Sequence, residues 1–181
     1  MKKSIIYSLF LGFTLMLCSF DNVKLTLNKT DSFIRYTLSH PAHESIGTTK
    51  DFICGGYYDN TTKKITKLVV AAAVASFDSQ NSSRDSHALE TLEGTKYPKV
   101  SFVSKAIKEE GNEVIIVGEL NFHGVKKDIT IKAKQTESDQ KIILSGSFNV
   151  SLDKFNVEKP SMMGVAVDDN LVMDFKTVFD I

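Results

Sequence analysis

Apolar residues recur at every second position over long stretches of the chain. The clearest stretch is 142–152, and shorter ones cover 100–107, 114–122, 129–133 and 171–179. Because successive side chains of a β-strand point to opposite faces, this period predicts strands with one apolar and one polar face. Turn-forming residues separate the stretches, so we expect consecutive antiparallel hairpins with turns at 109–112, 123–127 and 138–140.

The first half of the chain alternates less regularly. We expect strands over 23–27, 33–38 and about 51–58. His40-Pro41 ends the second of these, because proline has no backbone N–H to donate. After a turn at 59–62, the run KITKLVVAAAVASF (64–77) has valines and alanines but no polar face. This composition predicts a strand that is buried on both sides or closely covered.

One segment departs from the strand pattern and predicts a helix from Ser83 to about Leu92. A hydroxyl of Ser82 or Ser83 is expected to cap its N-terminus, where the first amides lack partners. Asp85 then lies near the positive end of the helix dipole, and Gly94 is a suitable C-terminal stop. The apolar stripe of this helix is small, enough to plug or flank a sheet.

Together these elements make an all-β chain of about eight or nine strands with one short helix. An antiparallel sheet of this length usually closes on itself because closure removes its edges, so we predict an antiparallel eight-stranded barrel. The interior of such a barrel either fills with side chains or holds one elongated ligand. Gly118 and Gly146 fall at inward positions, where they reduce filling or allow a bend. The alternation does not decide between a filled interior and one that holds a ligand.

Charge and motifs exclude several classes of function. The 181 residues carry 22 basic and 22 acidic side chains, so no overall field attracts nucleic acid. Sequence motifs of serine hydrolases, phosphate-binding loops and zinc proteases do not occur, so we expect no enzyme and no catalytic residue. Once a leader is removed, Cys54 is the sole thiol, and we interpret it as a small buried hydrophobe.

The N-terminus has the pattern of a secretory signal peptide. Residues 1–3 are positively charged and 5–17 form an apolar run that is too short for a good membrane span. We therefore expect residues 1–20 to be a leader and 21–181 to be a domain that is periplasmic or otherwise exported. Cys18 gives an alternative, a lipoprotein signal, in which lipidation would bring the protein into contact with a membrane.

Three longer segments carry a resemblance to a known family. They are SFDSQNSSRDSHALETLEGTKYPKVSF, VGELNFHGVKKDITIKAK and SGSFNVSLDKFNVEKPSMMGVAVDDNLVMDF, which follow one another between residues 76 and 175. The resemblance as a whole extends over nearly all of the exported part. Their Arg-Asp-x-His helix start, Tyr-Pro strand entry and Gly-x-Leu hairpin are similar to those of the YceI-like family. The resemblance implies a lipocalin-like barrel, exported from a bacterium, whose interior binds a long isoprenoid or similar amphiphilic lipid. The chain departs from the family pattern at His40–His43 and at Ala88, which concerns the mouth of the cavity rather than the barrel.

On this interpretation the ligand chain lies among inward-pointing apolar side chains. The predicted binding residues are Phe102, Leu120, Phe122, Ile131, Leu144, Phe148, Met163 and Phe175. Arg84 and His87 are the polar residues that we expect either to contact a ligand head group or to fix the helix over the barrel. No cofactor is expected, and dimerisation stays open.

Two alternatives come from other classes of function. The four histidines His40, His43, His87 and His123 could meet at one rim and hold a metal or haem, although no carboxylate or cysteine cluster accompanies them. The second alternative is a barrel whose side chains fill the interior completely and which serves a structural or interaction role.

Overall fold

The computed structural model describes residues 22–181 with the exception of 112, 139 and 163. The expected leader, with Cys18, and the predicted binding residue Met163 lie outside the described residues. The strands are β1 (Asn22–Leu27), β2 (Phe33–His40), β3 (His43–Thr49), β4 (Phe52–Asp59), β5 (Lys64–Ala73), β6 (Lys99–Glu110), β7 (Glu113–Phe122), β8 (Val125–Ser138), β9 (Lys141–Ser151), β10 (Ser161–Met162), β11 (Val165–Ala166) and β12 (Asn170–Asp180). The helices are α1 (Ser82–Thr91) and the short 3-10 turns η1 (Val74–Ser76) and η2 (Asp153–Phe155).

Eight strands close into an antiparallel barrel in the order β1-β4-β5-β6-β7-β8-β9-β12. The ring closes where β1 pairs with the end of β12, through Thr26 opposite Asp180 and Leu27 opposite Phe179. The sequence-based prediction of an all-β, eight-stranded barrel with one short α-helix is thereby confirmed. In the part of the chain that the structure describes, no helix is both long and apolar enough to cross a membrane.

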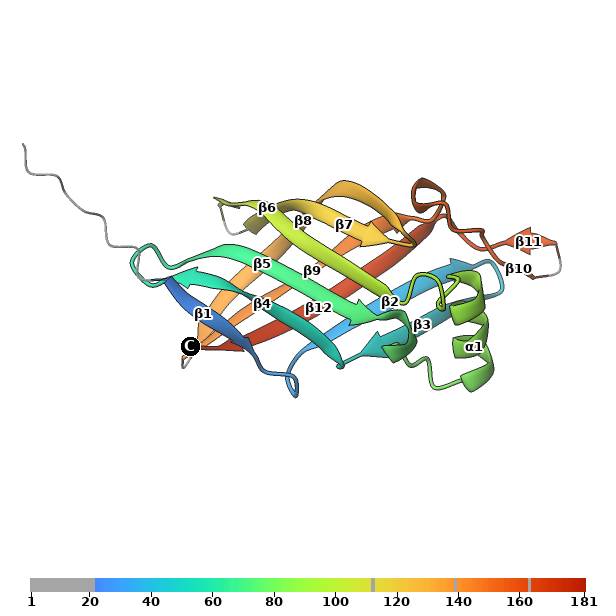
Figure 1. The fold of residues 1–181 in the computed structure, drawn as a ribbon, viewed down its shortest axis with the longest axis horizontal. Coiled ribbons are helices and arrows are strands. Elements are labelled where there is room, and N and C mark those ends of the chain that lie inside the picture. The colour runs from blue at the N-terminus through green and yellow to red at the C-terminus, as the bar shows by residue number, and fades with distance from the viewer. Residues whose placement is uncertain (1–21, 112, 139, 163) are drawn as a thin grey trace, which may run out of the picture.

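The two ends of the barrel differ in construction (Figure 1). At one end β12 pairs with β1, and both chain ends of the barrel lie there. Toward the other end β12 pairs with β2 over 171–176 instead, and β3 extends the wall by pairing with β2. A bridge between Thr48 and Asp78 ties the outer edge of β3 to the segment after β5. The helix α1 and the β10–β11 hairpin lie at this second end.

Strand β3 was missing from the sequence-based prediction, which passed from residue 38 directly to a strand near 51. The residues His43–Thr49 read HESIGTT and have no apolar alternation, so the pattern gives no signal. Their strand structure comes from pairing with β2, and Gly47 leaves space for the ring of Tyr36 on that strand. A Cβ atom on Gly47 would lie 2.7 Å from the Tyr36 Cζ atom.

The expectation for residues 64–77 was wrong in two respects. The strand β5 ends at Ala73, and η1 follows. Its outer face is open rather than covered, because Val69 is 36% exposed while Leu68 and Ala72 are buried on the inside. The alanines and valines thus make an ordinary barrel strand with a partly apolar outer face.

The helix α1 begins one residue earlier than predicted, and its N-cap is Asn81 rather than a serine. The Asn81 side chain accepts a hydrogen bond from the Arg84 amide at 3.1 Å, which satisfies one of the unpaired N–H groups of the first turn. Asp85 lies in that turn, as expected. At the C-terminus the Gly94 amide donates to the Leu89 carbonyl at 2.8 Å, and Glu93 takes the left-handed conformation.

Candidate functional site

The barrel contains a cavity of about 480 Å³ that opens at the end covered by α1. Its wall is made by side chains of β2 to β9 and β12, and its roof by α1 and the segment from η2 to β12. The wall residues are almost all apolar: Ile34, Tyr36, Leu38, Cys54, Leu68, Val70, Ala72, Val100, Phe102, Ile116, Leu120, Phe122, Ile131, Leu144, Phe148, Val150, Leu152, Leu171, Met173 and Phe175. A cavity of this kind suits a ligand with a large apolar part.

Two glycines on the wall give room to aromatic rings. A Cβ atom on Gly118 would lie 2.5 Å from the Phe102 Cζ atom, and one on Gly146 would lie 3.1 Å from the Phe175 ring. Each ring therefore packs against the backbone of a neighbouring strand at its glycine. The sequence predicted that these glycines reduce filling or allow a bend, whereas the rings of Phe102 and Phe175 occupy the space that they leave.

The roof helix has no fully buried residue, although it lies over the barrel. Its Ala88, Leu89 and Leu92 are half-buried, and all three line the cavity. A helix that packed on a filled core would bury such side chains completely. Their partial exposure follows from the space below them.

Seven of the predicted apolar binding residues line the cavity, and the eighth is Met163. The seven are Phe102, Leu120, Phe122, Ile131, Leu144, Phe148 and Phe175. Their contact with a ligand remains a prediction. The prediction omitted wall residues whose alternation was visible in the sequence, above all Ile34, Tyr36 and Leu38 on β2 and Met173 on β12.

The polar side chains of the site gather at the mouth. Arg84 and Asp85 on α1 are half-buried, and both line the cavity together with the more exposed His87. Burial is the main cause that raises the pKa of the Tyr36 phenol; Asp85 raises it further and Arg84 lowers it, so the three groups share one neighbourhood. Among the described residues, no carboxylate forms an ion pair with Arg84. Its guanidinium can therefore pair with an acceptor supplied from outside.

Three of the four histidines belong to the mouth, and the fourth does not. The rings of His40 and His43, at the tip of the β2–β3 hairpin, are 5.4 Å apart and line the cavity as His87 does. His40 is already engaged: its Nδ1 accepts from the Ala42 amide at 3.1 Å and its Nε2 lies 3.1 Å from the Val165 carbonyl oxygen.

His123 is held elsewhere and does not line the cavity. Its Nδ1 lies 3.2 Å from the Phe155 carbonyl oxygen, and the Tyr97 ring packs edge-on against it. Its Nε2 lies 3.1 Å from a Glu93 carboxylate oxygen, close enough for an ion pair but not aligned as a hydrogen bond. The expectation of one rim shared by four histidines is wrong for this residue.

The described side chains give little support to metal or nucleophilic chemistry. Within the ranges that the structure describes, no group of three histidine, cysteine, aspartate or glutamate residues is placed to hold a metal ion. Burial raises the pKa of the Cys54 thiol to about 12, so this thiol stays protonated at neutral pH and is a poor nucleophile. The arrangement favours binding of an apolar molecule.

Comparisons with known proteins agree with this geometry. The YceI-like domain family matches residues 25–179. Protein YceI of Salmonella newport (strain SL254) is 31% identical over 144 residues, which make up 74% of this chain and 73% of that protein.

Two solved structures show the same fold. BcnA of Burkholderia cenocepacia superposes with a TM-score of 0.76 at 20% identity, over 84% of this chain and 99% of that chain. A polyisoprenoid binding domain from Saccharophagus degradans superposes with a TM-score of 0.67 at 12% identity, over 87% of this chain and 97% of that chain. From the family match and the curated relative, we conclude that this chain belongs to the YceI-like domain family.

Proposed function

We propose that the protein is an exported binding or carrier protein that holds a long isoprenoid, or a similar amphiphilic lipid, inside the open half of its barrel. The observation that carries the proposal is the cavity of about 480 Å³, whose wall is mostly apolar and whose charged and histidine side chains lie around its mouth. The polyisoprenoid binding domain that shares the fold supports the same ligand class.

The energetics favour such a ligand. Each 100 Å² of apolar surface that leaves water contributes about 2.5 kcal/mol, so one buried chain can offset the entropy lost on association. The aromatic rings of Phe102, Phe148 and Phe175 supply large contact areas. Without a ligand, the apolar wall of the cavity would be in contact with water. Binding of an apolar chain releases this water and is therefore favourable.

The distribution of polar groups sets the expected orientation. The chain enters first, and the head group stays at the mouth near Arg84 and His87. Arg84 has no ion-pair partner among the described residues, and a guanidinium forms paired hydrogen bonds with carboxylate or phosphate oxygens. A head group with such oxygens is therefore the best match.

We infer export of the protein from the leader-like residues 1–20. Export explains why a lipid carrier would be needed. A long-chain lipid cannot cross water unaided, and a protein outside the cytoplasmic membrane can shield it. Expression of the full chain in a bacterium, followed by fractionation and N-terminal sequencing, tests this part. Retention of residues 1–20 on a cytoplasmic protein would contradict it.

The central experiment is gentle native mass spectrometry of the exported protein, followed by solvent extraction and identification of the extracted molecule. The proposal predicts a stoichiometric apolar ligand of long-chain mass, or its uptake on incubation with polyprenyl and fatty-acyl lipids. A ligand-free mass that persists after such incubation would overturn it.

The role of the mouth residues is tested by Arg84→Ala and His87→Ala. If they contact the head group, these variants bind lipid more weakly while a matched exposed change, Ser83→Ala, leaves affinity unchanged. Unchanged affinity together with lowered stability would leave only a structural role for these two side chains on α1.

A further inference from the structure

The cavity ends at a layer of side chains that closes the other half of the barrel. On strand after strand, the last residue of the cavity wall is followed on the same face by a buried residue that does not reach the cavity. This change occurs from Leu68 to Ile65 on β5, Ile116 to Val114 on β7, Ile131 to Ala133 on β8, Leu144 to Ile142 on β9 and Thr177 to Phe179 on β12. We call the layer of Leu25, Tyr58, Ile65, Val114, Ala133, Ile142 and Phe179 the floor.

Tyr58 crosses the barrel within this layer. It lies on β4, and its phenol oxygen donates a hydrogen bond of 2.6 Å to Glu137 on β8. In the ring of eight strands β4 and β8 are four places apart, so they face each other across the interior. The Tyr58 side chain is fully buried, and burial is the main cause that raises its pKa. The Tyr58 side chain is therefore held by its backbone on β4 and by its hydroxyl on β8.

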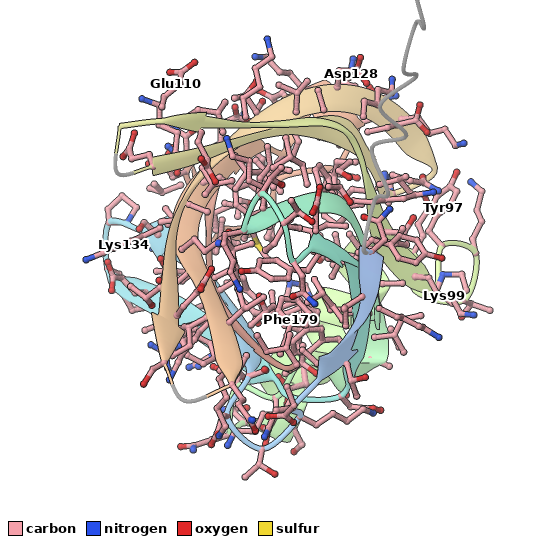
Figure 2. The ribbon with its side chains drawn as sticks, turned by 90° about the vertical axis from the view of Figure 1, so that its left-hand side faces the viewer. Tyr97, Lys99, Glu110, Asp128, Lys134 and Phe179 are labelled. Atoms are coloured by element: carbon pink, nitrogen blue, oxygen red, sulfur yellow. The ribbon has the colours of Figure 1, made fainter. Side chains whose placement is uncertain are left out.

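Phe179 is another fully buried member of this layer. It pairs with Leu27 on β1 and Ile142 on β9, and its side chain is fully buried. Figure 2, viewed along the barrel from this end, shows Phe179 within the ring of strands. The neighbouring inward residue toward the mouth is Thr177, whose hydroxyl donates its hydrogen to the Leu144 carbonyl.

We propose that the floor, through Tyr58, Ile142 and Phe179, sets the maximum length of lipid chain that the cavity can bury. The inference rests on the proposed function and adds the class of ligand: a single-tailed amphiphile that enters tail first and stops at the floor. The floor thus determines chain-length specificity, while Arg84 and His87 at the mouth contact the head group.

The wall gives an estimate of that length. Its residues on β12 run from Leu171 to Thr177, which is about 20 Å along a strand at ~3.3 Å per residue. Barrel strands tilt by about 40°, so the depth is about 15 Å. An extended chain with bonds of about 1.5 Å advances about 1.25 Å per carbon, and about 12 carbons reach the floor.

The test is a calorimetric titration with straight-chain fatty acids of increasing length. In the native protein affinity should rise about fourfold for each added methylene until the chain meets the floor, and then level off. In Phe179→Ala and Ile142→Ala the rise should continue to longer chains. Ile143→Ala, which removes the same atoms from the outward face of β9, should leave the limit unchanged.

Two further results separate the inference from the proposed function. A native protein that binds no chain of any length overturns both. A native limit that stays the same in both floor variants overturns the role of the floor and leaves lipid binding intact. Tyr58→Phe keeps the ring and loses only the hydrogen bond to Glu137, so this variant should be less stable but level off at the same chain length. If Phe179→Ala does not fold, Ile142→Ala still provides the test.

Discussion

Both halves of the barrel interior are lined by alternating apolar residues, but one half is filled by side chains and the other encloses a cavity. Around Tyr58 and Phe179 the inward side chains are fully buried and lie outside the cavity, whereas the walls formed by β2, β7 and β9 enclose it. A barrel interior is usually either filled or hollow. In this protein the filled part and the hollow part lie at opposite ends of the same barrel.

The difference has a cause in the strand arrangement. At the filled end eight strands close the ring, a size at which inward side chains fill the interior. Toward the mouth β12 leaves β1 and pairs with β2, and β3 adds to the wall. A longer circumference encloses a wider space.

The largest expected effect on this contrast comes from removing one aromatic ring in each half. Phe179→Ala should lower the free energy of unfolding by about 3–5 kcal/mol, because it opens a void in a filled layer. Phe148→Ala should cost only about 1 kcal/mol, because its half-buried ring already borders a cavity. Denaturant unfolding of both variants measures the difference, and equal losses would contradict a hollow mouth half.

Filling the cavity should affect binding more than stability. Leu120→Trp puts a larger side chain into the open half, and the lost volume should weaken binding of a long-chain lipid by about tenfold or more. Val103→Trp is the matched control, since Val103 is 42% exposed on the outer face of β6. A similar loss of affinity in both variants would place the ligand outside the cavity.

A smaller effect is expected at the roof. Asn81→Ala removes the cap of α1 and should cost about 1 kcal/mol. Because this helix has no fully buried residue to hold it, its amides should exchange faster with solvent while those of the filled half keep their protection. Ser82→Ala, at the position that the sequence suggested, should change neither. Faster exchange throughout the barrel would show that the two halves open together.

The smallest expected effect is a pH dependence at the closed end. The pKa of Asp59 lies below its ordinary value, chiefly because the Thr62 amide donates to its carboxylate in the β4–β5 turn. A lowered pKa in the folded state contributes stability that is present above pH ~4 and is lost as the pH falls through the folded value. Asp59→Asn should flatten this acid loss in denaturant midpoints, and an identical pH profile would contradict the assignment.

The alternating pattern was sufficient to predict the walls but not the space between them. Ile142 and Leu144 are equally apolar and two residues apart, yet the first belongs to the floor and the second to the cavity. Their different surroundings depend on which strands lie opposite, which a period of two does not encode. The strand β3 was missed for a related reason, because its residues carry no pattern and owe their structure to pairing with β2.

The mouth was predicted in part. Arg84 and His87 lie where the helix start suggested, whereas His123 points to Phe155 and Glu93 instead of the rim. A histidine in a turn can face either way, and the sequence gives no sign of which neighbours its ring will meet. The Asn81 cap could have been found, since asparagine is as good a capping residue as serine.

The central claim is that a lipid chain lies in the open half of the barrel, and a single tryptophan can report on it directly. The chain has no tryptophan of its own, so Phe148→Trp places the sole indole on the cavity wall. Tyr57→Trp, at an exposed position on the outer face of β4, is the control. Titration with a polyprenyl phosphate should change the emission of the first variant saturably and leave the second unchanged. No change in the first variant, or an equal change in both, would contradict the account.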